Sequence, residues 1–77
     1  MSPEGETMSR YLIVIENAGS NYSAYSPDLP GCATTGPTVE ETKRSMEDAI
    51  EFHLEGLREE SLPIPPPTSI AEYVEVS

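Results

Sequence analysis

Basic residues are scarce in this 77-residue sequence. Four Lys and Arg stand against fourteen Asp and Glu, which gives a formal net charge of −10. Nucleic-acid-binding proteins neutralise phosphates with clustered Lys and Arg, so we expect no direct nucleic-acid binding by this chain alone. The surplus of acid suits a basic protein partner, because complementary fields speed encounter. It equally suits a small protein that is kept soluble by its charge.

Cysteine and long apolar runs are also lacking. Cys32 is the single cysteine, so the chain has no internal disulfide and no Cys/His cluster for zinc. We expect neither a metal nor a cofactor. No apolar run approaches the roughly 18–20 residues that span a bilayer, and the polar, acidic N-terminus does not resemble a signal peptide. These absences favour a cytoplasmic protein without membrane attachment.

The order of the predicted elements is β-β-β-α-β, within one domain over residues 10–77 that follows a disordered lead over residues 1–9. The predicted elements are strands over 10–16, 22–25 and 32–35, a helix over 39–60, a proline-rich tether over 61–69 and a last strand over 70–76. The last strand is expected to pair parallel to the first through a right-handed crossover. The predicted fold class is therefore α+β, with one long helix on one face of a small mixed sheet.

The first predicted strand is apolar on both faces. Tyr11, Ile13 and Ile15 face one way, while Leu12 and Val14 face the other. One helix covers a single face of a sheet, and a domain of this size buries only roughly 60% of its unfolded surface. We therefore expect these residues to form a core face and an oligomer face, in a dimer or tetramer.

The predicted helix has a start signal and two unlike faces. Thr38 and Glu41 have the spacing of a capping box, in which the Thr hydroxyl accepts from the amide three residues on. Apolar residues recur at helical spacing on one face. The other face is acidic, and Glu47, Glu51 and Glu55 are candidate partner contacts there. A solvated acidic face without a partner is the alternative.

Three residues invite a chemical role and are better explained by structure. Asp28 stands between prolines, where a turn residue is favoured over a partner contact, and a partner contact over a catalytic carboxylate. His53 lies at the margin of the apolar helix stripe without a nucleophile motif, so a packing role is favoured. Cys32 is interpreted as a small core residue rather than a redox thiol.

Three sequence blocks, in this order, resemble the HicB family of antitoxins. They are Tyr11–Glu16 with a following turn, the block Pro27-Asp28-Leu29-Pro30-Gly31-Cys32 before the Thr38 helix start, and the acidic helix that leads into Leu62–Pro67. The second block is the most specific of the three. Together the blocks span most of the chain.

The resemblance implies a partial ribonuclease-H-like fold that is dimeric or larger. It also implies a partner similar to HicA, a small basic ribonuclease toxin that the antitoxin covers. Longer family members carry a DNA-binding module after this domain, and no such module follows the last predicted strand before Ser77. Operator binding by this chain alone is therefore left open.

Two other functions stay open at this point. One is a structural or adaptor oligomer of the same fold with a different partner. The other is a residual metal-dependent nuclease, which needs several carboxylates converging on divalent ions. The first strand has no acid between Tyr11 and Ile15, so a non-enzymatic binding protein is the favoured interpretation.

Overall fold

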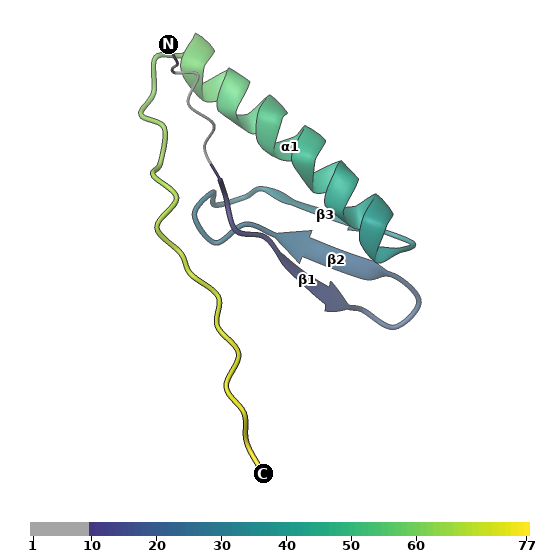
Figure 1. Cartoon of the computed structure of the whole chain (residues 1–77). Helices are drawn as coiled ribbons and strands as arrows, with labels where there is room; N and C mark the ends of the chain where they lie inside the picture. The colour runs from purple at the N-terminus through teal and green to yellow at the C-terminus, as the bar shows by residue number, and fades with distance from the viewer. Residues whose placement is uncertain (1–9) are drawn as a thin grey trace, which may run out of the picture.

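The computed structural model describes residues 10–77, and the lead predicted over residues 1–9 lies outside the described residues. Three strands, β1 (Val14–Asn17), β2 (Tyr22–Tyr25) and β3 (Ala33–Gly36), precede one helix, α1 (Val39–Glu59). The strands form an antiparallel sheet in the order β1-β2-β3, and α1 lies across one face of it (Figure 1). The predicted α+β class, with a β-β-β-α order and one long helix on a small sheet, is confirmed.

The predicted fourth strand is not formed within this single chain. Residues 70–76 carry no strand pairing, so the sheet described here is antiparallel rather than mixed. After α1 the chain runs past the start of β1 and then away from the sheet (Figure 1). A strand requires a neighbour for its backbone N–H and C=O groups, and the path of the proline-rich segment gives residues 70–76 none in their own chain. β1 is also shorter than predicted and begins at Val14 rather than Arg10.

The β1–β2 hairpin is closed by a short polar turn. The Ala18 amide donates to the Asn21 carbonyl at 2.8 Å, and the Gly19 amide donates to Asn17 Oδ1 at 2.8 Å. Gly19 has a φ of +100°, a conformation that side chains with a Cβ rarely adopt. The turn sets the register in which Val14 faces Tyr25 and Ile15 faces Ala24.

The core lies between the sheet and α1 and is small. Its buried apolar members are Ala24, Leu29, Cys32 and Met46. Around them pack partly buried apolar side chains of the sheet and the helix, namely Tyr11, Ile13, Ile15, Ala49, Ile50 and Leu54. The odd-numbered residues of the first apolar run therefore face α1.

The opposite face of the sheet has no covering layer among residues 10–77. Val14, Tyr25 and Ala33 form one cross-strand row on this open face, in register across all three strands. Tyr25 and Ala33 are exposed and Val14 is half-buried. Leu12 precedes this row on the same side of the chain. The first apolar run therefore has one face against α1 and one face that no layer of the described chain covers.

The beginning of α1 is held by Thr38 and by its close approach to β3. The Glu41 amide donates to Thr38 Oγ1 at 3.1 Å, and Thr42 Oγ1 donates to the Thr38 carbonyl at 2.6 Å. A Cβ at Gly36 would lie 2.5 Å from Thr42 Oγ1 and 3.0 Å from the Thr42 backbone. The helix can therefore pack this closely on β3 only because residue 36 has no side chain.

We expect Gly36→Ala to destabilise the fold and Gly56→Ala, its matched control, to stabilise it. The added methyl at residue 36 meets Thr42 backbone and should cost about 1–3 kcal/mol of unfolding free energy. Residue 56 is exposed within α1, and a methyl added there would have no neighbour within 4 Å, so helix propensity should add about 0.5–1 kcal/mol. Urea denaturation followed by circular dichroism measures both changes. Equal stability of the two variants would contradict the close packing of α1 on β3.

Candidate functional site

The loop between β2 and β3 folds back on itself around Leu29. The Leu29 amide donates to the Ser26 carbonyl at 3.2 Å, the Cys32 amide donates to the Leu29 carbonyl at 3.1 Å, and the Ser26 amide donates to the Cys32 carbonyl at 3.2 Å. Gly31 has a φ of +83° and makes this return possible. Leu29 is fully buried, whereas Pro27 and Pro30 are exposed. The sequence block 27–32 therefore inserts one apolar side chain into the core.

Asp28 points the other way and holds the segment that follows α1. Its Oδ2 accepts from the backbone amides of Thr68 (3.2 Å) and Ser69 (3.1 Å). Its Oδ1 accepts from the hydroxyls of the same two residues, at 3.1 Å and 2.9 Å. We call Asp28, Thr68 and Ser69 the Asp28 latch. It joins parts of the chain that are 40 and 41 residues apart.

The latch favours the charged form of Asp28. The hydrogen bond from the Ser69 amide is the largest influence and lowers the pKa of Asp28 below its ordinary value of 3.8. Partial desolvation opposes it, and the Ser69 hydroxyl, the Thr68 hydroxyl and the Thr68 amide add to the lowering. At neutral pH the Asp28 carboxyl is therefore charged, which is the form that accepts these four hydrogen bonds.

A second anchor fastens the same segment, ahead of the latch, to the start of the first apolar run. Tyr11 OH donates to the Pro65 carbonyl at 2.6 Å. Pro65 is half-buried, and the run Pro65-Pro66-Pro67 has its φ angles fixed by the proline rings. The tether predicted over residues 61–69 is thus an extended segment fastened to the domain at two places.

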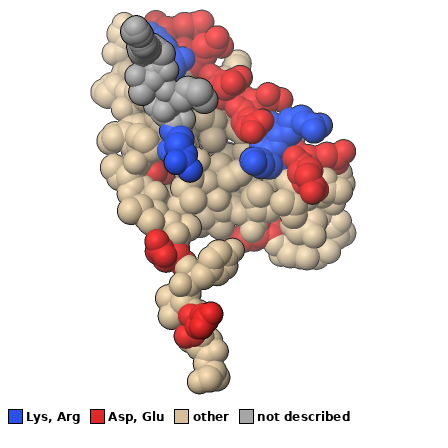
Figure 2. Space-filling view, in the orientation of Figure 1, with Lys and Arg blue, Asp and Glu red and all other residues tan. Residues whose placement is uncertain are grey.

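The exposed face of α1 is acidic. Glu47, Glu51 and Glu55 recur at every fourth residue, which places them on one helical face, and all three are exposed. Figure 2 shows acidic side chains gathered along the helix, with basic side chains between them. Lys43 and Arg44 are the basic residues nearest the helix start. This face is able to attract a basic surface.

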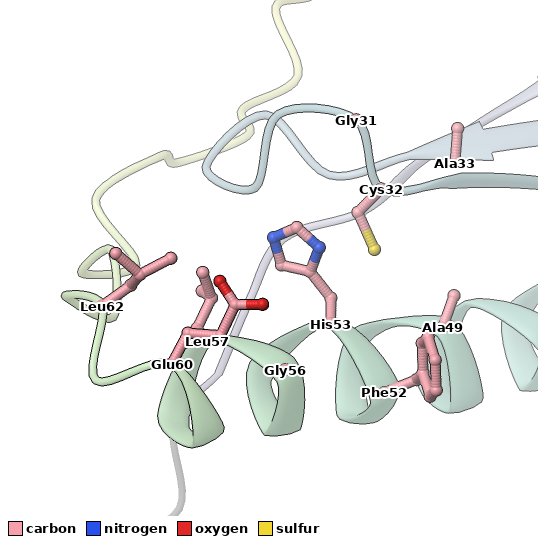
Figure 3. A pocket seen from close by; sticks show the side chains of 10 residues that line it. All are labelled: Gly31, Cys32, Ala33, Ala49, Phe52, His53, Gly56, Leu57, Glu60 and Leu62. Carbon is pink, nitrogen blue, oxygen red and sulfur yellow. The ribbon is translucent and has the colours of Figure 1, made fainter.

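An open groove of about 430 Å³ runs between the far half of α1 and the start of β3. His53 lies in it, with its ring between the helix and the Gly31–Cys32 backbone (Figure 3). Cys32 is buried at the groove floor, and burial raises the pKa of its thiol. Phe52, also at the groove, is 80% exposed. Cys32 is part of the core, and His53 is half-buried.

Of the residues singled out from the sequence, Cys32 and His53 line one groove, whereas Asp28 and the acidic helix residues lie apart. Asp28 and the acidic helix residues lie on different elements, and Asp28 is bonded to its own chain. Thr68, Ser69 and Pro65 were missed, because hydroxyl residues in a proline-rich segment give no local signal of a partner 40 residues away. Within residues 10–77, no group of three or more His, Cys, Asp or Glu side chains is placed to hold a metal ion, and no helix is long and apolar enough to cross a membrane.

Comparison with known proteins finds one matching family and several relatives. Residues 11–77 match the model of the HicB-like antitoxin of bacterial toxin–antitoxin systems. A protein of 14.9 kDa from the rep–hol intergenic region of Haemophilus phage HP1 is 36% identical over 64 residues, covering 83% of this chain and 48% of its own. A UPF0150 protein of Synechocystis is 36% identical over 56 residues, 71% of each chain. A UPF0150 protein of Helicobacter pylori is 39% identical over 49 residues, 64% of this chain and 68% of its own.

The fold and the site define a small α+β domain whose surface features are an acidic helix and an anchored C-terminal segment. The match over residues 11–77 identifies the family of this domain. The chain belongs to the HicB-like antitoxin family. It spans about half the length of the phage relative and about 70% of the Synechocystis one. The resemblance drawn from the three sequence blocks is thereby confirmed.

The Asp28 latch should open on acidification. Because the folded pKa of Asp28 lies below 3.8, the carboxylate stabilises the latch above that pH, and its contribution is lost as the pH falls through the folded pKa. In NMR spectra, the amide protons of Thr68 and Ser69 should shift together in one transition below about pH 3.8. Asp28→Asn should give the open-latch shifts already at pH 6.

Ser69→Ala tests the contribution of a single hydroxyl bond to the latch. It retains the backbone donor of residue 69 and removes only the hydroxyl bond, so the pKa of Asp28 should rise part of the way toward its ordinary value. A carboxyl carbon titration by NMR measures it. An unchanged pKa in both Ser69→Ala and Thr68→Ala would contradict the latch.

Proposed function

We propose that this chain is a non-enzymatic antitoxin that binds a small basic ribonuclease similar to the HicA toxins and keeps it from RNA. Membership of the HicB-like antitoxin family supports an antitoxin role. The observation that points to a basic partner is the exposed acidic face of α1 in a chain with a net charge of −10. Such a pair would act in the cytoplasm, where mRNA is exposed to the toxin.

Charge complementarity would give this interaction its speed and its selectivity. A ribonuclease binds a phosphate backbone, so its substrate surface is basic. A row of carboxylates on a rigid helix presents negative charge without a cleavable bond. Glu47, Glu51 and Glu55 lie on one face at about 6 Å of helix rise from one another. We propose these three residues as the central toxin contacts.

Asp28 has a different proposed role. In the folded chain its carboxylate oxygens accept four hydrogen bonds from Thr68 and Ser69. A toxin side chain would have to compete with these bonds. Asp28 therefore contributes to binding through the position of residues 65–69 rather than as a direct contact.

The test is co-purification of this chain with the product of its neighbouring gene, followed by an RNA-cleavage assay. A small basic protein should co-purify, and its cleavage of RNA should stop when this chain is added. The variant Glu47→Gln/Glu51→Gln/Glu55→Gln should weaken binding about tenfold at low salt, since three exposed ion pairs contribute roughly 0.5 kcal/mol each. The loss should shrink as salt screens the charges.

A matched control comes from the same helix. Lys43→Gln/Arg44→Gln removes charge of the opposite sign, so it should leave affinity unchanged or raise it. If both variants weaken binding equally, α1 is not the acidic docking face. If no basic protein binds and RNA cleavage continues, the toxin-neutralising role is wrong, and a structural or adaptor role with another partner takes its place.

A further inference from the structure

The last eight residues leave the domain as an extended arm. We use the name C-terminal arm for residues 70–77. Its apolar side chains are almost fully exposed: Ile70 is 82%, Tyr73 103%, Val74 80% and Val76 89% exposed. Among residues 10–77, no hydrogen bond joins the arm to the rest of the chain. Four large exposed apolar side chains within eight residues are typical of a segment that binds another surface.

The composition of the arm is that of a strand. β-branched and aromatic residues make up half of it, and its apolar residues fall on two alternating faces. Ile70, Val74 and Val76 lie on one face, while Ala71 and Tyr73 lie on the other. A strand that is apolar on both faces fits beside a strand with the same property, and the first apolar run of this chain is one.

The point where the arm leaves the domain is fixed. The Asp28 latch holds Thr68 and Ser69, and Tyr11 OH holds the Pro65 carbonyl. Ile70 follows the latch directly and lies beside the start of the first apolar run, where Ser69 and Ile70 line a shallow hollow with Arg10, Tyr11 and Leu12. From there the arm diverges from its own β1 (Figure 1). The anchored tether thus presents the arm outward, next to an unpaired sheet edge.

That edge belongs to β1, which pairs with β2 on one side and with no strand of the described chain on the other. An exposed edge presents a row of free N–H and C=O groups that can accept another strand. Residues 11–15 are five consecutive apolar residues. β1 itself reads Val-Ile-Glu-Asn and continues this apolar run, whereas the other sheet edge, β3, reads Ala-Thr-Thr-Gly and follows no such run. The β1 edge is therefore the better receiver.

We propose that the C-terminal arm of one copy adds as a fourth strand to the β1 edge of a second copy, and that the second arm does the same in return. The donor segment and the receiving edge are both on this chain, and Ile70 lies beside residues 10–12, the start of the apolar run that leads into β1. The sheet of each copy would thereby gain the strand that its own chain does not supply. At about 3.3 Å per residue, the arm is roughly 25 Å long, enough to cover β1 and the apolar residues before it.

Salt separates this self-association from toxin binding. Two copies of a chain with a net charge of −10 repel each other, so arm exchange should strengthen when salt screens the repulsion. Binding of the proposed basic partner should weaken under the same change. Failure of one proposal therefore leaves the other testable.

The first experiment is sedimentation velocity on the full chain over a range of protein concentrations and salt. The full chain should be a dimer, and Val74→Asp should raise the dimer dissociation constant at least tenfold. Val74 is exposed in the single chain, so this variant should keep the circular dichroism spectrum of the folded domain. Glu75→Gln is the neighbouring control, and it should dimerise at least as tightly as the unchanged chain.

The second experiment identifies the contact directly. In a mixture of isotope-labelled and unlabelled copies, NMR should detect intermolecular NOEs between the methyl groups of Val74 or Val76 and those of Leu12 or Val14. Amide hydrogens of residues 70–76 should be protected from exchange at high protein concentration and lose protection on dilution. A monomeric full chain overturns the proposal. A dimer that survives Val74→Asp, without NOEs from the arm, also overturns it and indicates pairing through the open sheet face.

Discussion

The insertion of Leu29 between sheet and helix is the interaction on which the rest of this structure depends. Its loop closes through three backbone hydrogen bonds, with Gly31 at the positive φ that the closure needs. Because α1 packs on the core that Leu29 fills, the loop decides where the helix lies. With Leu29 held inward, Asp28 is held outward, where it accepts the amides and hydroxyls of Thr68 and Ser69. Asp28 is therefore both a residue of this turn and the anchor of the segment that follows α1.

A small core and a large charge set the conditions for function. Four buried apolar residues and a half-covered sheet leave the described part of the chain with little buried area. Apolar surface remains on the open sheet face and on the arm, whereas the charge is concentrated along α1. The two kinds of surface suit different associations: apolar pairing with a second copy, and electrostatic docking of a basic partner.

Local pattern was sufficient for much of this protein. The spacing of apolar residues determined the long helix, Thr38 marked its start, and the alternation in the first run identified the residues that face it. The Pro-Asp-Leu-Pro-Gly-Cys block, with its neighbours, was sufficient to identify the family. These features depend on residues near one another in the chain, so a periodicity or a short motif expresses them.

The tertiary structure alone decided which long-range bonds form. Nothing near Thr68 or Ser69 indicates that Asp28 will bind them, and nothing in Tyr11 indicates Pro65. The prediction of a last strand was wrong for a single chain because it, too, depended on a long-range partner. Its residues have strand composition, but a strand exists only where a partner edge lies alongside, and the anchored tether carries residues 70–76 away from β1 of their own chain. Composition determines what a segment is able to form, and the path of the chain decides whether a partner is there.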